Sequence, residues 1–419
     1  MKKLLTIILS VLMLVGIAGC TKPEVVNEGP VEITYWHTYT EHHNEYLTGI
    51  VDEFNASQNE VKVVLVQQPY QDYDANLLQA LRNGVGPDIC SRFPTNVADY
   101  IDEDLLVDFA PYINDATIGI PNFKENLTGF VYGEITQWGD GAIYMIPNIC
   151  TSEVFYYNKT LFEELNLEVP KTWEELEEVS RVIYQKTGKP GFGTDSAIDT
   201  FQGLLIQNGS GYINAETKQM DLDYDVALEQ LTWLADCIKE GIFRLPGDDF
   251  YLSGPFCSGA VASYIGSSAG VGYATMNNGA FEVGCAPIPQ AGKVLYSSSW
   301  GGGFVCFKTT EAKAKAAYKF LKWFTSTEMT SRWAINLGAL PAYISGMETA
   351  EYQDYINTNI AAEALYASKD FINWLNAIKG SAGVRTAIDK MISEACLNNV
   401  DPKTALDDMI AAANAELNQ

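Results

Sequence analysis

Hydrophobic and polar positions along the first hundred residues alternate in a way that predicts strands and helices in turn. Strands are predicted at residues 31–36, 61–66 and 87–90, and helices at 41–57 and 73–83. The order β-α-β-α-β predicts parallel strands joined by right-handed crossovers. Ligands bind such sheets beyond the carboxyl ends of the strands, which here are followed by residues 36–38, 67–70 and 91–93.

The rest of the chain predicts a second set of elements. Residues 143–147 and 154–157 indicate two short strands around a polar stretch, where we expect the chain to cross to a second lobe. Thr172, with Glu175 three residues later, forms a capping box that predicts the start of a helix. Further helices are predicted at 226–240, at 311–325 and through most of 351–418.

The first twenty residues have the pattern of a secretory signal peptide. Lys2 and Lys3 precede an apolar run at 4–17, and small residues then lead to Cys20. The run is shorter than the roughly 20 residues that a membrane span needs. The pattern is similar to that of bacterial lipoproteins. This resemblance implies a signal peptide at 1–19, a lipid on Cys20, a tether at 20–30 and a place on the outer face of the cell membrane.

Length and charge narrow the class of protein. The chain has 419 residues, more than one hydrophobic core usually serves, so we expect two lobes. The formal net charge is −26, and it becomes about −28 without the signal peptide, which holds two lysines and no acid. Nucleic acid is excluded as a partner, because phosphate contacts need a basic face.

The spacing of the cysteines does not indicate a disulfide framework or a zinc site. Without Cys20, seven remain, at positions 90, 150, 237, 257, 285, 306 and 396. They are widely spread, mostly among apolar neighbours, and show neither a CxxC pair nor the spacing of zinc ligands. An odd number in an exported protein predicts buried free thiols.

Short blocks along the whole mature chain resemble the family 1 extracellular solute-binding proteins, which serve importers of sugars and glycerol-3-phosphate. The blocks are ITYWH at 33–37, GPDI at 86–89, YMIP at 144–147, FYYNK at 155–159, PKTWEEL at 170–176, WGGG at 300–303 and GALP at 338–341. Each block alone is weak, but their order and spacing together are specific.

The resemblance implies an α/β, two-lobe fold of the type II periplasmic-binding-protein kind, with a hinge and a ligand cleft between the lobes. The expected first lobe is 31–145 with 298–346, and the second is 146–297 with 347–419. It also implies a monomer without cofactor or metal that delivers a small solute to the permease and ATPase of an ABC transporter.

Candidate ligand contacts follow from strand ends and from the resemblance. Aromatic rings suit the C–H faces of sugars, and planar polar groups suit hydroxyls. The candidates are Trp36, Tyr70, Tyr73, Arg92, Phe93, Asn148, Ser267, Ser268, Trp300, Gly302 and Arg385. Arg92 and Arg385 are expected either to donate to ligand or to form ion pairs with carboxylates.

The resemblance leaves the ligand open between a neutral sugar-like solute and a glycerophosphate. Where the glycerol-phosphate binders carry a tyrosine this chain has Ala339, and their acidic residue after the third strand is replaced near Pro94. These departures favour a sugar. A secreted glycosidase is the enzyme alternative, but the sequence contains no catalytic motif for hydrolysis or nucleotide binding.

Two stretches contain residue types that can bind metal ions. His37, His42 and His43 lie within seven residues, but two of them point about 100° apart on a helix and the third belongs to a strand. The aspartates at 221, 223 and 225 match the first ligand positions of an EF-hand calcium-binding loop. The glycine and the final glutamate that such a loop requires are missing. Asp225 is instead predicted to cap the following helix.

Overall fold

The computed structural model describes residues 29–419. The predicted signal peptide, the predicted lipidation site Cys20 and most of the predicted tether lie outside the described residues. In residues 29–419 no helix is long and apolar enough to cross a membrane. All seven cysteines of this part of the chain are free thiols, five of them buried, as predicted from their number and neighbours.

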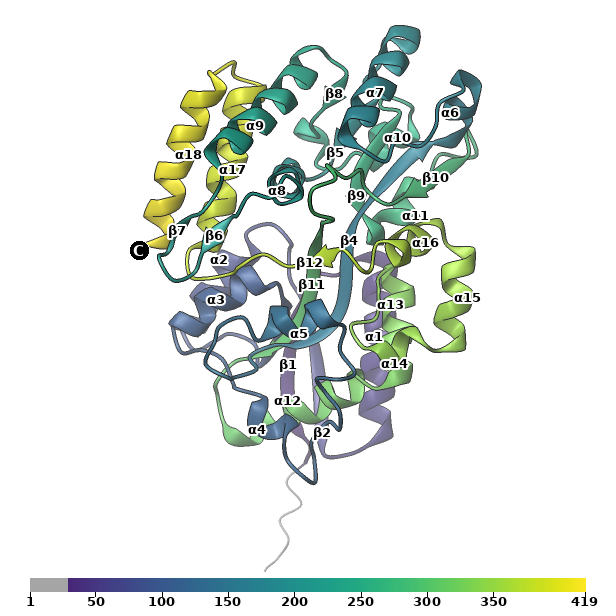
Figure 1. Cartoon of the computed structure of the whole chain (residues 1–419). Coiled ribbons are helices and arrows are strands. Elements are labelled where there is room, and N and C mark those ends of the chain that lie inside the picture. Colours follow the sequence, from purple (N-terminus) through teal and green to yellow (C-terminus); the bar gives the residue numbers. More distant parts are fainter. Residues whose placement is uncertain (1–28) are drawn as a thin grey trace, which may run out of the picture.

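One mixed sheet runs through the molecule and connects its two ends (Figure 1). Its strand order is β2 (Val61–Gln67), β1 (Val31–His37), β3 (Ile89–Arg92), β11 (Ser297–Cys306), β4 (Ile146–Asn158), β9 (Ser263–Ser267), β5 (Phe192–Thr194) and β8 (Phe243–Arg244). β10 (Val283–Ala286) pairs with β4, and β12 (Ile372–Asn373) pairs with β11. We call the part around β1, β2 and β3 the first lobe, and the part around β5, β8 and β9 the second lobe.

The β-α-β-α-β order predicted for the start of the chain is confirmed. β1 lies between β2 and β3 and is parallel to both, and the helices α1 (Glu41–Ser57) and α2 (Tyr73–Arg82) connect the three strands. α1 presents a buried stripe of Leu47, Ile50, Val51 and Phe54 to the sheet. β1 runs toward the second lobe (Figure 1), so the carboxyl ends of the three parallel strands point that way.

The two short strands predicted around residues 148–153 are wrong as separate elements, because a single strand, β4, spans 13 residues. The polar stretch does not end the strand, since the side chains of Thr151 and Ser152 each find a partner on the neighbouring strand. Thr151 Oγ1 donates to the Trp300 carbonyl at 3.0 Å, and Ser152 Oγ donates to the Ser298 carbonyl at 2.7 Å. The partners lie on β11, so β4 stays extended through the stretch.

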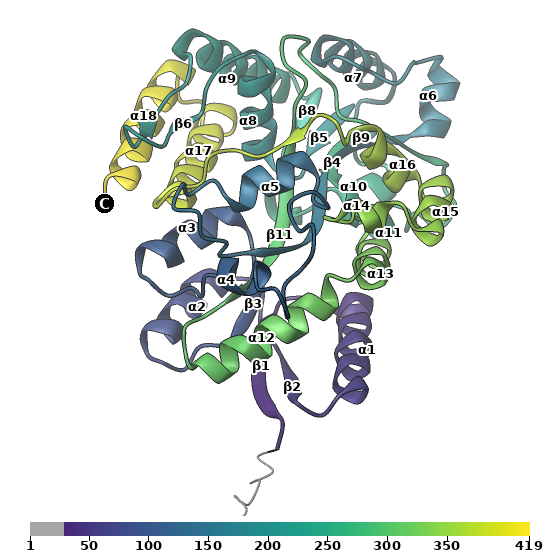
Figure 2. The ribbon, with the colours of Figure 1, turned by 60° about the horizontal axis from the view of Figure 1, so that its bottom comes forward.

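β4 and β11 lie side by side and run from one lobe into the other (Figure 2). Their antiparallel register shifts between Gly302 and Gly303, which is a β-bulge. A bulge bends its strand locally, so the crossing has a built-in bend at the junction of the lobes. The boundaries predicted for the two lobes stay a prediction.

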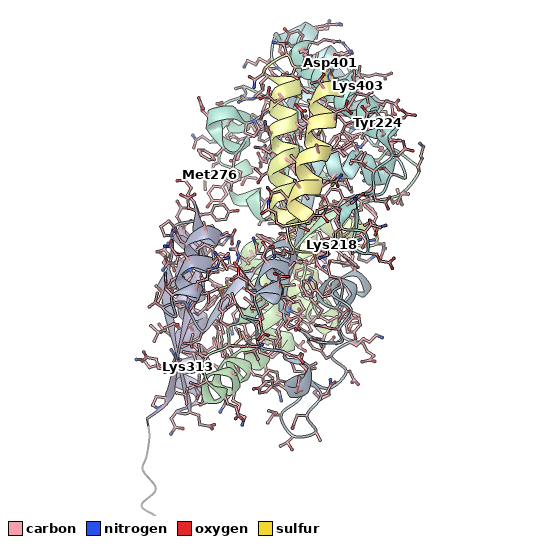
Figure 3. All side chains as sticks on the ribbon, turned by 90° about the vertical axis from the view of Figure 1, so that its left-hand side faces the viewer. Lys218, Tyr224, Met276, Lys313, Asp401 and Lys403 are labelled. Atoms are coloured by element: carbon pink, nitrogen blue, oxygen red, sulfur yellow. The ribbon has the colours of Figure 1, made fainter. Side chains whose placement is uncertain are left out.

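Helices cover both faces of the sheet and enclose two clusters of buried hydrophobic side chains. The first cluster gathers β1, β3, α1 and α12 (Glu311–Phe324), and the second gathers α7 (Trp173–Thr187), α8 (Ala197–Gln207), α9 (Tyr224–Lys239), α17 (Ser381–Cys396) and α18 (Pro402–Leu417). α17 and α18 lie side by side on the outside of the second lobe (Figure 3).

The remaining helices are shorter. They are α3 (Pro94–Asp102), α4 (Ala110–Ile113), α5 (Gly129–Ile135), α6 (Lys159–Leu165), α10 (Ser253–Cys257), α11 (Val271–Ala274), α13 (Thr327–Leu337), α14 (Ile344–Met347), α15 (Ala350–Thr358) and α16 (Ile360–Ala367). Two short 3₁₀ turns lie at Gly247–Asp249 and Ser268–Gly270, and β6 (Ile213–Asn214) pairs with β7 (Gln219–Met220).

The N-terminal cap of α7 is the one predicted from the sequence, whereas that of α9 differs from the prediction. The Thr172 side chain accepts from the Glu175 amide, and the Glu175 side chain accepts from the Thr172 amide, which confirms the capping box. The cap predicted at Asp225 is wrong: Asp223 caps α9, and its side chain accepts from the amides of Asp225 and Val226. The helix starts at Tyr224, two residues before the predicted start at residue 226.

We predict that Thr172→Ala lowers the free energy of unfolding by about 1 kcal/mol, because the amide of Glu175 loses its acceptor. Urea unfolding followed by circular dichroism measures this change. Thr217→Ala, at an exposed turn, is the control and should change stability by less than about 0.5 kcal/mol. Equal stability of the two variants would contradict a role for the cap.

Candidate functional site

The carboxyl ends of β1 and β3 gather four of the predicted contact residues. The Arg92 guanidinium lies 4.9 Å from the ring centroid of Tyr73 and 5.9 Å from that of Phe93. The Tyr73 hydroxyl donates to the Trp36 carbonyl at 3.4 Å. Tyr73 is buried and Phe93 is exposed. The sequence therefore placed these residues in one group, of which Phe93 presents its ring to solvent.

The charge of Arg92 is already paired within the protein. Its Nη2 lies 2.5 Å from Asp74 Oδ1 and donates to Asn96 Oδ1 at 3.1 Å. The Arg92 side chain is only 9% exposed, and its Nε is buried without a partner among residues 29–419. Arg92 thus orders the end of β3 and offers little charge to a ligand.

Exposed aromatic side chains lie on both lobes. Tyr70 is 68% exposed on the first lobe, and Tyr251 is 60% exposed on the second. Burial raises the pKa of Tyr251, and Tyr70 lies close enough to contribute to this shift. Phe250, beside Tyr251, is also exposed. Each lobe thereby exposes flat apolar rings to solvent.

On the second lobe Arg385 and Trp300 meet at one carboxylate, that of Asp199. Arg385 donates to Asp199 through two nitrogens, at 2.8 Å and 2.9 Å, and to Gln202 Oε1 at 3.1 Å. The Asp199 carboxyl is buried, yet its pKa stays below its usual range, because Arg385 opposes the effect of burial and the nearby Trp300 indole lowers the pKa further. Both predicted residues are thus brought together, with Arg385 in an ion pair.

Glu153 lies beside this pair on β4 and has no partner of its own. The residue is 2% exposed, and its Oε1 has no hydrogen-bond donor among the described residues. Burial raises the pKa of Glu153 well above its usual value, and Asp199 and Asp195 raise it further while Arg385 lowers it. A buried carboxylate without a donor is unfavourable when ionised, so the surroundings of Glu153 favour its protonated form.

Asp195, at the end of β5, completes the acidic side of this group. Its Oδ1 accepts from the Leu252 amide at 2.6 Å. Burial raises the pKa of Asp195 to about 6, although the Leu252 amide lowers it. We call Glu153, Asp195 and Asp199 with Arg385 the acidic cluster. It carries three carboxyl groups against one guanidinium.

The other predicted residues lie at or near the strand crossing. Asn148 Nδ2 donates to Ser91 Oγ at 2.8 Å, and a side chain added at Gly302 would meet Asn148 Oδ1 at 3.5 Å. The Ser267 hydroxyl accepts from the Ala269 amide, whereas the buried hydroxyl of Ser268 has no partner among residues 29–419. Asn148 Oδ1 likewise lacks a donor in the described chain.

A cavity of about 380 Å³ borders the acidic cluster on the second lobe. Asp195 and Ser196 line it at the start of α8, Phe250 lines it from the loop after β8, and Asp389 lines it from α17, one helical turn beyond Arg385. Its lining, as far as the structure describes it, includes two carboxylates and no basic side chain. Its volume is in the range of small-molecule sites.

A second cavity, of about 370 Å³, lies where α1 meets α11 and α13. Its lining includes His42, His43 and Tyr273, and the Tyr273 hydroxyl donates to Glu41 Oε2 at 3.3 Å, which joins the two lobes. Burial is the main cause that lowers the pKa of His43. No group of three or more His, Cys, Asp or Glu side chains in the described part of the chain is arranged to hold a metal ion.

Sequence reasoning missed Glu153, Asp195 and Asp199. Glu153 did leave a signal, because it is the one acid in the otherwise uncharged stretch 143–157. Asp195 and Asp199 left none, since they stand in an ordinary loop and helix start.

A family model described as "Bacterial extracellular solute-binding protein" matches residues 49–360. The sn-glycerol-3-phosphate-binding periplasmic protein UgpB of Yersinia enterocolitica is 23% identical over 415 residues, which cover 93% of this chain and 92% of the relative.

Two solved structures are similar over almost their full length. The cyclic alpha-maltosyl-1,6-maltose binding protein of Arthrobacter globiformis has a TM-score of 0.78 at 24% identity, and the match covers 93% of this chain and 99% of that one. UgpB of Mycobacterium tuberculosis in complex with glycerophosphocholine has a TM-score of 0.80 at 17% identity, with the same coverage. These matches confirm the predicted α/β fold.

Proposed function

The chain belongs to the family of bacterial extracellular solute-binding proteins, and on this basis we propose that it captures a carbohydrate-like solute between its two lobes. In this proposal the protein acts as a monomer and delivers the solute to the permease and ATPase of an ABC transporter. Family membership also confirms the predicted class, a binding protein and not a glycosidase.

The observation that carries the sugar proposal is the arrangement of rings and planar polar groups on the two lobes. Tyr70 and Phe93 offer exposed rings on the first lobe, and Tyr251 does so on the second. Trp300 and Arg385 stand together at Asp199. Stacking faces close to hydrogen-bonding groups suit a ring that carries hydroxyls. The maltosaccharide-binding protein of Arthrobacter globiformis, with the same fold, supports this ligand class.

A glycerophosphate is the second candidate, because the UgpB relatives bind sn-glycerol-3-phosphate and match over most of the chain. A phosphate needs free guanidinium groups or free amides at helix N-termini. Arg92 and Arg385, the two arginines among the predicted contacts, are already paired with Asp74 and Asp199. The pairing favours a ligand without phosphate.

A melting-shift panel followed by calorimetry tests the proposal. The panel holds neutral mono- and oligosaccharides, polyols, sn-glycerol-3-phosphate and glycerophosphocholine, and a ligand raises the melting temperature without being converted. We expect neutral sugars to bind and the phosphates to bind weakly. Tight binding of a glycerophosphate alone would refute the carbohydrate proposal, and turnover of an oligosaccharide would refute the binding role.

We predict that Arg385→Ala and Arg385→Lys each weaken binding of the best sugar by about 10- to 100-fold, because neither side chain restores the paired guanidinium contacts with Asp199. Calorimetry measures the dissociation constants. Arg332→Lys, whose guanidinium bonds Glu53 on the surface, is the control and should leave them unchanged. Unchanged affinity in both Arg385 variants would make this residue structural only.

We further propose that the protein is anchored to the membrane through a lipid on Cys20, and we predict that Cys20→Ala abolishes fatty-acid labelling. The reason is that only the cysteine thiol after the small residues of the signal peptide can accept the lipid. Metabolic labelling in cells that express each form measures it, with Cys257→Ala as the control. Full label in the Cys20 variant would refute the anchor.

A further inference from the structure

β2 forms the edge of the sheet in the first lobe, because β1 is its one partner strand among residues 29–419. At one end of this ladder the Val31 amide donates to the Glu60 carbonyl at 2.8 Å. At the other end the Gln68 amide donates to the His37 carbonyl, also at 2.8 Å. Even-numbered residues of this segment therefore turn their main-chain groups toward β1, and odd-numbered residues turn theirs to the outer edge. The outer positions are Val61, Val63, Leu65 and Gln67.

The sequence of β2 suits the addition of another strand. It reads VKVVLVQ, with four valines, one charged residue and neither proline nor glycine. Short segments of this kind, rich in β-branched residues and poor in charge, pair readily with identical segments of another copy. An open edge with this sequence would therefore draw two copies of the protein together.

Two side chains from the end of α1 cover half of this edge. Asn55 Oδ1 accepts from the Val63 amide, and Asn55 Nδ2 donates to the Val63 carbonyl, both at 2.9 Å. Gln58, directly after the last residue of α1, accepts from the Val61 amide at 2.8 Å and donates to the Val61 carbonyl at 2.7 Å. Figure 2 shows α1 on the side of β2 that lies away from β1.

These bonds have the pattern of a neighbouring strand. In an antiparallel pair, opposite residues exchange one N–H···O bond in each direction at every second position. Asn55 and Gln58 make the same exchange at two successive outer positions, because a side-chain amide carries the donor and acceptor of a peptide group. Only Leu65 and Gln67 remain for an added strand, and two positions are fewer than a stable strand pair needs.

We propose that the outer edge of β2 is a docking edge for β2 of a second copy of this chain, and that Asn55 and Gln58 keep it closed. Two identical strands related by a two-fold axis pair in antiparallel fashion, so each copy would offer its outer positions to the other. The two amides occupy these positions first. The inference goes beyond solute capture and does not depend on the ligand, and it gives a physical reason for the proposed monomer.

The double variant Asn55→Ala with Gln58→Ala opens the edge, and sedimentation velocity over a series of protein concentrations measures association. The concentration at which half of the chains are dimeric should be at least about tenfold lower for the double variant than for the wild-type protein. Each single substitution opens one position and should have a smaller effect in the same direction. Circular dichroism shows whether each variant is folded, and the single variants carry the test where the double variant is not.

Asn126→Ala is the matched control for lost hydrogen bonds. Asn126 is half-buried on a turn, and its amide also works in both directions, since it accepts from the Ser345 amide and donates to the Ser345 hydroxyl. This variant loses similar bonds away from the edge of β2, so it should stay as monomeric as the wild-type protein.

A rescue substitution tests whether β2 itself is the contact. Val64 lies on the same face of β2 as the exposed Lys62, because alternate residues of a strand share a face. Adding Val64→Lys to the double variant should reverse its association, since lysines on both copies repel one another across the paired strands. The substitution restores neither amide, so a gain of stability cannot explain such a reversal.

The outcomes decide the inference without reference to the ligand. Folded variants that are as monomeric as the wild-type protein would overturn it, and so would a wild-type protein that dimerises as tightly as the double variant. Equal association of Asn126→Ala, or association that Val64→Lys leaves unchanged, would show that another surface is responsible. None of these results bears on solute capture, which the melting-shift panel tests separately.

Discussion

Glu134→Gln should raise the free energy of unfolding near pH 8 by about 3 to 5 kcal/mol relative to the wild-type protein, and by much less at about pH 5. Glu134 is buried on α5 where β11 crosses between the lobes, and burial raises its pKa to about 8. Because the folded protein holds the proton and the unfolded chain releases it near pH 4.5, stability from this group is lost as the pH rises through that interval.

Urea unfolding at several pH values between about 5 and 8 measures the effect, as the difference between the variant and the wild type at each pH. Glu164→Gln is the matched control, because it makes the same substitution at an exposed position of α6. The control difference should stay within about 0.5 kcal/mol at every pH. A Glu134→Gln difference that does not grow with pH would show that Glu134 is ionised in the folded protein.

Asp88→Ala should lower the free energy of unfolding by about 2 to 4 kcal/mol. The Asp88 carboxylate is buried at the start of β3 and accepts from the Thr34 amide at 2.8 Å and from Lys313 Nζ at 2.9 Å. It therefore ties β1 to α12, on which Lys313 is labelled in Figure 3. Without it, the Thr34 amide on β1 loses an acceptor.

Chemical unfolding of Asp88→Ala measures this loss, and Asp104→Ala provides the comparison. Asp104 pairs with Lys308 on the surface and is 90% exposed, so its removal should cost less than about 1 kcal/mol. A similar cost for both variants would mean that the burial of Asp88 does not strengthen its contacts.

The first lobe could be predicted closely from the sequence because its elements are coded locally. The β-branched run at 61–66 and the apolar stripe of α1 predicted their elements to within one residue. Thr172 and Glu175 marked the start of α7 for the same reason, since a capping box needs only four neighbouring residues.

β4 could not be predicted as one strand, because the hydrogen bonds that satisfy its polar side chains come from residues far along the chain. Ser152 bonds Ser298, which is 146 positions away. A polar stretch looks like a break until its partner strand is known. The same limit explains the cap at α9, where two aspartates in alternate positions gave the same local signal.

The sequence predicted several residues of the candidate site, but not the ion pair that one of them forms. Trp300 and Arg385 were placed in the site from the sequence, and they do lie together. The carboxylate that joins them, Asp199, is 186 positions from Arg385, so nothing near either residue announced the ion pair. Distant partners of this kind decide whether an arginine is free to bind a ligand or is already held in an ion pair within the protein.

The free thiols can be used to measure local unfolding of the protein. Cys90, Cys150 and Cys306 are buried in the first core cluster, and Cys237 and Cys396 in the second. A thiol reagent reaches such a sulfur only when the segment around it opens, so the rate of modification at each position reports the local free energy of opening. Mass spectrometry of partly modified protein would thus reveal whether the two cores unfold as one cooperative unit or separately.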